Sequence, residues 1–121
     1  MKKIIVAFLI FISAFMYKGE ILSYAASDTK SIKMGNIMYK KGKFDEALKY
    51  YNKAKIDAPN SAIVNFNTGT ALYKKREYKK AIDSFISALS SAGPKLESKI
   101  NYNIANAKYR MGRNSVSTDL Q

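Results

Sequence analysis

The side chains that could do acid–base chemistry in this chain are carboxylates, because its 121 residues include no histidine and no cysteine. It therefore lacks the usual general base near neutral pH and the usual soft metal ligands. Beyond residue 25 the carboxylates are scattered: Asp28, Asp45, Glu46, Asp57, Glu77, Asp83, Glu97 and Asp119. Asp45 and Glu46 are adjacent at a predicted helix start, where they face different sides and favour the helix dipole. We expect no enzyme activity, metal or cofactor unless a second chain supplies catalytic groups.

The strongly basic composition limits the kinds of partner. Lys and Arg number 21 against nine Asp and Glu, for a net charge of +12. This balance favours anionic partners such as acidic peptides, lipid headgroups, nucleic acid or cell-wall polymer. Basic runs at 40–41, 74–76 and 79–80 could bind such a polyanion electrostatically. They fall at helix ends, where cations suit the dipole, so we treat that binding as the alternative and nucleic acid as unlikely. A salt titration would separate the two cases.

The first 25 residues have the order of an export signal. Two lysines precede an uncharged run of 14 residues from Ile4 to Tyr17, and small residues follow at Ser23 and Ala25. This order is typical of a secretory signal peptide, and the run is shorter than the roughly 20 residues of a membrane span. Cleavage after Ala25 would remove three lysines and Glu20 and lower the net charge from +12 to +10. We expect export to the bacterial periplasm or the outer face of the cytoplasmic membrane, with an uncleaved anchor as the alternative.

A sequence repeat dominates the rest of the chain. The segment "MYKKGKFDEA" at 38–47 recurs as "LYKKREYKKA" at 72–81, and the 34-residue offset also relates Gly35 to Gly69 and Tyr51 to Phe85. A fixed period of this length is typical of repeat architectures. Without cysteine there are no disulfides, so the stability of this small domain must come from packing.

The repeat is predicted to be helical, because small and apolar residues recur every three or four positions. Gly42, Pro59 and the Gly93–Pro94 pair interrupt the pattern. Five helices are expected at about 28–41, 44–57, 61–75, 78–91 and 96–111. Ser27 or Asp28, and Asn60 or Ser61, are suitable N-caps. Short amphipathic helix pairs cannot bury their apolar faces alone, so the units must stack.

These residues resemble the tetratricopeptide repeat family. Its signature Gly, Ala, aromatic, Ala and Pro positions correspond in the first unit to Gly35, Ala47, Tyr51, Ala54 and Pro59. In the second unit they correspond to Gly69, Ala81, Phe85, Ala88 and, in place of Pro, Gly93. Ser31 and Asn65 replace the signature Trp. The resemblance implies an all-α fold, a right-handed superhelical stack of antiparallel helix pairs, with repeats at 28–61 and 62–95 in a domain spanning 26–121.

A third unit begins at residues 96–113 and lacks its second helix. Ala105 occupies the Gly position, 36 residues after Gly69, so the loop "SAGPKLES" carries two extra residues. After Gly112 only a tail at 114–121 remains, with Ser117 where a small Ala is expected. Either this helix caps the solenoid, or the chain is a fragment of a longer protein.

In this family the first helices of successive units line a concave groove that binds peptides. The resemblance implies that the groove residues are Lys33, Asn36, Tyr39 and Lys40 in the first unit, Phe66, Asn67, Thr70, Tyr73 and Lys74 in the second, and Lys99, Tyr102, Asn103, Asn106, Tyr109 and Arg110 in the third. Amides can pair with an extended backbone, aromatic faces can hold apolar side chains, and cations can attract carboxylates. We expect a protein or peptide partner that is acidic or has a free C-terminus, and no small-molecule substrate.

Two finer resemblances bear on the partner. Some members of the family clamp a C-terminal carboxylate, and Asn36, Asn67 and Lys99 match three of the five clamp positions, whereas Ile32 and Asn103 do not. The leader, "FNTGTALYKK", the Pro-containing loop and "YNIANAKYRMG" together are similar to repeat proteins of bacterial aerotolerance (Bat) operons. That resemblance implies a scaffold beside membrane proteins with von Willebrand A-type domains.

Overall fold

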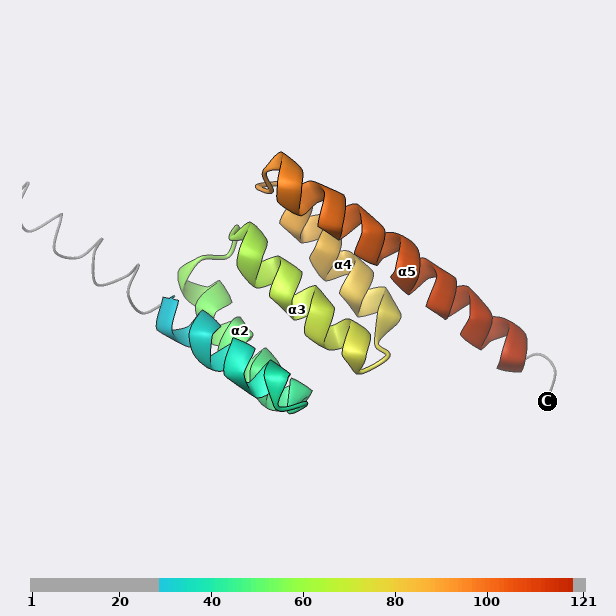
Figure 1. Cartoon of the computed structure of the whole chain (residues 1–121), viewed down its shortest axis with the longest axis horizontal. Coiled ribbons are helices and arrows are strands. Elements are labelled where there is room, and N and C mark those ends of the chain that lie inside the picture. The colour runs from blue at the N-terminus through green and yellow to red at the C-terminus, as the bar shows by residue number, and fades with distance from the viewer. Residues whose placement is uncertain (1–28, 119–121) are drawn as a thin grey trace, which may run out of the picture.

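The computed structural model describes residues 29–118, and the expected signal peptide lies outside this part of the chain. Residues 29–118 form five helices and no strand, which confirms the all-helical class (Figure 1). The helices are residues 29–40, α2 (Phe44–Asp57), α3 (Ala62–Lys74), α4 (Tyr78–Leu89) and α5 (Pro94–Thr118). The boundaries expected for the last helix, 96–111, were wrong at both ends.

The early start and late end of α5 have simple physical causes. Pro94 occupies the first helical position, where its fixed φ and missing N–H are tolerated, and the Gly93 carbonyl accepts from Leu96 N at 3.0 Å and Glu97 N at 2.9 Å. At the other end, Gly112 lies inside the helix. A single interior glycine costs only about 1 kcal/mol relative to Ala, so it does not by itself end a helix.

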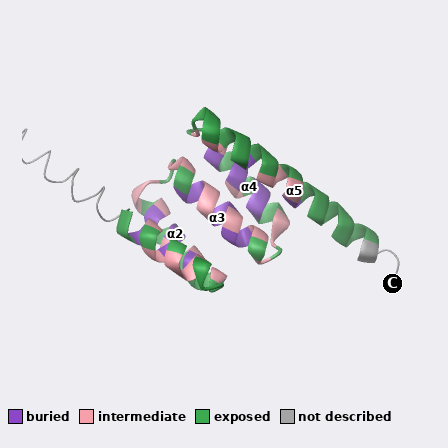
Figure 2. Ribbon diagram, viewed as in Figure 1, coloured by how far each residue is buried: buried purple, intermediate pink, exposed green. Residues whose placement is uncertain are grey.

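The helices form a sequential stack of antiparallel pairs, consistent with a tetratricopeptide-like solenoid. The 29–40 helix, α3 and α5 lie towards the viewer in Figure 1, with α2 and α4 behind them. Helix α3 packs on both α2 and α4, and α5 packs mainly on α4 with a smaller contact to α3. Buried residues face the helix interfaces, whereas α5 is exposed along much of its length (Figure 2). The second helix of each pair therefore lies behind a continuous front surface.

Each helix pair is held together by a glycine that faces an aromatic ring. A Cβ on Gly69 would lie 2.6 Å from Phe85 Cδ1, and a Cβ on Gly35 would lie 2.6 Å from Tyr51 Cδ1. Phe85 and Tyr51 are almost fully buried, at 1% and 2% exposure. The glycines recognised in the repeat are thus needed for space, since any side chain there would displace the ring that fills the centre of its unit.

The buried ring of the first unit, Tyr51, carries a hydroxyl group that Phe85 lacks, and this hydroxyl bonds the amide of Asn36, which in turn joins the two units. Tyr51 donates to Asn36 Oδ1 at 2.8 Å, and Asn67 Nδ2 donates to the same oxygen at 3.1 Å. Burial, followed by the nearby Tyr39, raises the pKa of Tyr51 to about 12, so the hydroxyl remains a donor. In the second unit Phe85 has no hydroxyl, and the residue matching Asn36 is Thr70, which bonds its own helix at Phe66 O.

The positions that replace the signature Trp are buried. Ser31 and Asn65 are 5% and 1% exposed. Asn65 Nδ2 donates to the Pro59 carbonyl at 3.1 Å, which fixes α3 against the turn that precedes it. The same turn contains the confirmed N-cap, because Ser61 Oγ accepts from Val64 N at 3.4 Å. At the second Trp position, the polar side chain of Asn65 therefore replaces the large indole ring and hydrogen-bonds the preceding turn.

The side of α3 that is buried in the stack corresponds to an exposed side of α5. Asn65, Gly69 and Leu72 are buried in α3, whereas the residues 36 positions later, Asn101, Ala105 and Lys108, are exposed in α5. Ile100 and Ala107, on a different side of α5, are instead fully buried. Within residues 29–118, α5 is the last helix of the stack, and this side of it is left exposed, which is compatible with either a capping helix or a fragment of a longer protein.

An ion-pair network links the first unit to the turn of the second. Lys75 Nζ lies 2.6 Å from Asp45 and 2.7 Å from Glu77, and Glu77 also binds Lys80 at 2.6 Å. Glu46 pairs separately with Lys43 at 3.3 Å, so the adjacent acids do face different sides. Hydrogen bonds from Lys75 and Lys80 hold the pKa of Glu77 at about 2, which makes it a poor general base.

The glycine contacts predict opposite effects for two identical substitutions. Gly69→Ala should lower the free energy of unfolding by about 1–3 kcal/mol, since the added methyl overpacks against Phe85. Gly112→Ala should raise it by about 0.5–1 kcal/mol, because nothing lies within 4 Å and Ala favours the helix. Urea unfolding of both variants tests this. Equal stabilities would contradict the assigned role of the Gly69–Phe85 contact.

The depressed pKa of Glu77 predicts an acid-dependent loss of stability. The ion pairs of Glu77 contribute fully to the stability of the fold when the pH is above about 4.5, the pKa of this carboxyl in the unfolded chain. This contribution is lost as the pH falls through about 2, its pKa in the folded chain. The stability difference between the parent and Glu77→Gln should therefore be largest at neutral pH and shrink towards pH 2. Urea midpoints between pH 2 and 7 measure it. A difference that does not change with pH would exclude this ionic contribution.

Candidate functional site

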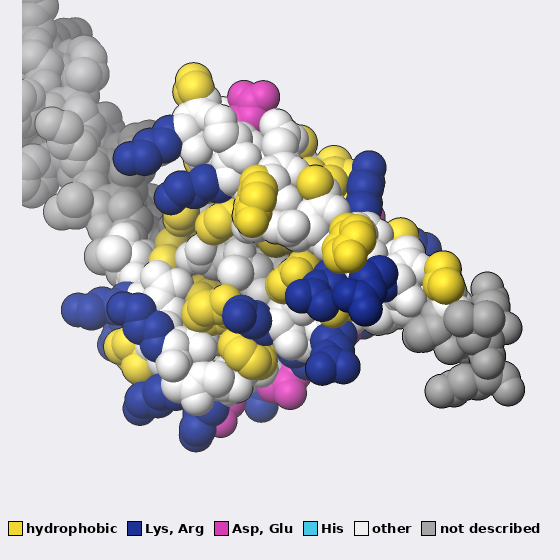
Figure 3. Space-filling view, turned by 45° about the vertical axis from the view of Figure 1, so that its right-hand side comes forward, with side chains coloured by type: hydrophobic (Ala, Val, Ile, Leu, Met, Phe, Trp, Pro, Cys, Tyr) yellow, Lys and Arg dark blue, Asp and Glu magenta, His cyan; other side chains and the backbone are white. Residues whose placement is uncertain are grey.

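All fifteen predicted groove residues lie on the three front helices, and none of them is fully buried. The exposed ones are Lys33, Asn36, Lys40, Lys74, Lys99, Tyr102, Tyr109 and Arg110, and the half-buried ones are Tyr39, Phe66, Asn67, Thr70, Tyr73, Asn103 and Asn106. Basic and apolar side chains are interspersed on this side of the molecule, with acidic ones near its edges (Figure 3). The predicted set is therefore at least partly accessible to solvent, and its role in binding stays a prediction.

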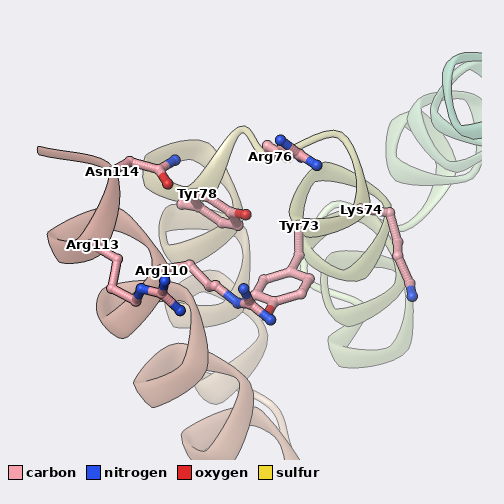
Figure 4. Close-up of a pocket in the computed structure, with 7 residues that line it drawn as sticks. All are labelled: Tyr73, Lys74, Arg76, Tyr78, Arg110, Arg113 and Asn114. Atoms are coloured by element: carbon pink, nitrogen blue, oxygen red, sulfur yellow. The ribbon is translucent and has the colours of Figure 1, made fainter. Parts of the chain in front are cut away.

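Two pockets lie along the seam between α3 and α5. The first, here called the basic pocket, has a volume of about 360 Å³. Its lining residues are Tyr73 and Lys74 from α3, Arg76 and Tyr78 from the turn and start of α4, and Arg110, Arg113 and Asn114 from α5 (Figure 4). Three chain segments thus converge on a single hollow.

The basic pocket is strongly electropositive because four of its seven lining residues are cations and none is acidic. The guanidinium of Arg110 hydrogen-bonds the Tyr73 side chain, and this raises the pKa of Arg110. Tyr73 in turn packs edge-on against Tyr78, with ring centroids 5.4 Å apart. The nearby carboxylate of Glu77 is engaged by Lys75 and Lys80. An anion entering the pocket would therefore meet oriented donors.

Arg76 lies in the pocket with a backbone conformation that arginine rarely adopts. Its φ is 63°, in the left-handed region, and the matching residue of the first unit, 34 positions earlier, is Gly42 with φ of 73°. The left-handed conformation has no steric cost for Gly42, whereas it costs a residue with a side chain roughly 1–2 kcal/mol. The same turn thus carries a guanidinium in the second unit and no side chain in the first.

The second hollow, here called the aromatic pocket, lies nearer the start of α5. It has a volume of about 320 Å³ and is lined by Phe66, Ser98, Lys99, Tyr102 and Asn103. Phe66 is fixed from behind by Phe85, with ring centroids 5.8 Å apart, while Tyr102 is 70% exposed. A pocket lined by one packed ring and one exposed ring is suited to an apolar side chain, and Lys99 and Asn103 add polar groups.

Sequence reasoning found part of the basic pocket and missed the rest. Tyr73, Lys74 and Arg110 were predicted, whereas Arg76, Tyr78, Arg113 and Asn114 were not. Arg113 and Asn114 were missed because the helix was expected to end before Gly112, although they follow Arg110 by three and four residues. Arg76 carried a usable signal, since it is a basic residue where the first repeat has glycine.

The amides of the proposed carboxylate clamp also have internal contacts. Asn36 Oδ1 accepts from both Tyr51 and Asn67, so the two amides join the first two units. Lys99, the third matching residue, lines the aromatic pocket. Any substitution of Asn36 or Asn67 would therefore change packing as well as the surface.

Comparison with known families supports the repeat assignment. A sequence model described as the tetratricopeptide repeat matches residues 32–61, a span that includes most of the first predicted repeat. The match supports the tetratricopeptide repeat family and a role as a protein–protein interaction module, a kind of protein that is typically not an enzyme. No curated protein matches the chain. Within residues 29–118, no helix is long and apolar enough to cross a membrane.

The left-handed backbone conformation of Arg76 predicts that the protein becomes more stable when this residue is replaced by glycine. Arg76→Gly removes a penalty of roughly 1–2 kcal/mol and adds an unfolded-state entropy cost of about 0.5–1 kcal/mol, so the free energy of unfolding should increase by up to about 1.5 kcal/mol. Arg76→Lys keeps the backbone strain and should stay within about 0.5 kcal/mol of the parent. Urea unfolding compares them, and a destabilised glycine variant would contradict the account.

Proposed function

We propose that this chain is an exported scaffold that binds a partner protein along the seam between α3 and α5, within an envelope complex. The observation that carries the proposal is the pair of pockets on this seam, one aromatic and one basic. Both are open to solvent and are lined mainly by side chains of α3 and α5, which suits recognition of a chain segment. The family match supports a protein partner rather than a substrate.

The location of the complex rests on the N-terminal pattern. The basic start, the apolar run and the small residues before Ala26 support export, and the similarity to repeat proteins of aerotolerance operons supports a membrane protein as the partner. The partner would then meet this chain in the periplasm or at the outer face of the cytoplasmic membrane. The net positive charge favours a partner with an acidic segment.

Affinity capture tests the proposal. The full chain, tagged at its C-terminus and produced in a bacterium, is used to capture proteins from detergent-solubilised envelope. A partner should be retained by the parent and lost from the double variant Lys99→Gln/Tyr102→Ser, because both side chains are exposed in the aromatic pocket. The matched control, Lys53→Gln/Ile86→Ser, removes an exposed cation and an exposed apolar side chain from α2 and α4 and should retain it.

The same sample reports on export. Mass spectrometry of the bait should find an N-terminus at Ala26, whereas a bait that begins at the initiator methionine would favour the uncleaved anchor. Capture of the same proteins by parent and pocket variant would overturn the groove proposal. Loss of every protein in moderate salt would favour electrostatic binding instead.

A further inference from the structure

The two pockets are spaced for successive side chains of one extended peptide. From Phe66 to Tyr73 along α3, and from Tyr102 to Arg110 along α5, the separation is seven and eight residues. At 1.5 Å per residue this is roughly 10–12 Å. An extended chain advances about 3.3 Å per residue, so the pockets are about three or four peptide residues apart.

The two pockets differ in chemistry, so a segment bound to both must carry a different kind of side chain at each position. The aromatic pocket is lined by Tyr102, 70% exposed, and by Phe66, which packs on Phe85, and two aromatic lining residues suit one large apolar side chain. The basic pocket offers Arg110 and Arg113 one helical turn apart, with Arg76 approaching from the turn of α4. Guanidinium groups bind carboxylates through two parallel hydrogen bonds, so several arginines favour more than one carboxylate.

The strained backbone at Arg76 is an independent indication that the basic pocket has a use. The first unit makes the same turn with Gly42, so the fold does not require an arginine there. Strain of this kind tends to persist at functional sites, where a side chain has to be held in place. Here it places a cation on the wall of the basic pocket opposite Arg110 and Arg113, in a pocket without acidic lining residues (Figure 4).

We propose that the partner segment is an extended acidic peptide with one large apolar side chain and, three or four residues away, a pair of carboxylates. This inference rests on the proposed function, because it names the ligand of that same seam. The apolar side chain occupies the aromatic pocket and the carboxylates occupy the basic pocket. Recognition uses side-chain carboxylates, and a free C-terminus is not required.

Binding of synthetic peptides to the full chain in detergent tests the pattern. Fluorescently labelled peptides, acetylated and amidated so that neither end is charged, carry one Leu and an Asp–Asp pair in a Gly–Ser background. The Leu precedes or follows the Asp pair by one, four or nine residues. A spacing of four in one chain direction should bind at least tenfold more tightly than the others. Replacing Asp–Asp by Asn–Asn, or Leu by Ser, should cost about tenfold or more, as expected when a charge-assisted pair or a buried contact is lost.

Variants assign each end of the peptide to its pocket. Arg113→Gln should weaken the Asp–Asp peptide about tenfold and leave the Asn–Asn peptide unchanged. Tyr102→Ser should weaken the Leu peptide and leave the Ser peptide unchanged. Arg76→Gly should weaken the Asp–Asp peptide while its thermal unfolding temperature stays the same or rises, which separates loss of the ligand contact from loss of the fold. Lys53→Gln, on the exposed surface of α2, should bind as the parent does.

The remaining outcomes overturn the inference. Affinity that follows the number of acidic residues whatever the Leu spacing, and that heparin abolishes, would mean a polyanion surface. Tighter binding by peptides with a free C-terminal carboxylate would indicate the carboxylate clamp. If no peptide binds and the pocket variant still loses a captured envelope protein, this inference fails and the proposed function stands. If capture is also unaffected, both fail.

Discussion

The close approach of a glycine to an aromatic ring is the constraint on which the rest of this structure depends. Gly69 leaves the space that Phe85 fills, and Gly35 does the same for Tyr51. Because each ring is buried in its own unit, the two helices of a pair are fixed relative to each other. Helix α5 is placed through Ile100, which joins the buried cluster that contains Phe85 and Leu72, and this sets the seam between α3 and α5. The pockets follow from packing that lies behind them.

Much of the fold could be predicted because its constraints are local and repeated. Gly35, Tyr51 and the small residues at Ala47 and Ala54 have counterparts 34 residues later, so each position was in effect observed twice. The boundaries of α5 could not be predicted in the same way, since this helix has no repeated partner. Its length depends on whether Gly112 ends it, and the cost of one glycine is small against the helix as a whole.

The candidate site was predictable to the extent that it follows the repeat. Tyr73 and Arg110 occupy family groove positions and were found. Arg113 and Asn114 depend on the continuation of α5, and Arg76 depends on a backbone angle that the sequence does not state. The internal hydrogen bonds of Asn36 and Asn67 were also not foreseeable, because the sequence shows which face an amide occupies and not the atom to which it is bonded. Departures from the repeat therefore mark where the chain differs from a generic scaffold.

Among the helices of residues 29–118, α5 is the last of the stack, and this position has a consequence for its dynamics. In a linear array a helix with neighbours on one side opens at a lower free energy than an internal one, and α5 is held mainly by α4. Amide hydrogens of α5 would thus exchange sooner than those of α3. A segment that bridges α3 and α5 would suppress this opening, so occupancy of the seam would lengthen the ordered array. The partner would then stabilise the packing of α5 as well as being recognised there.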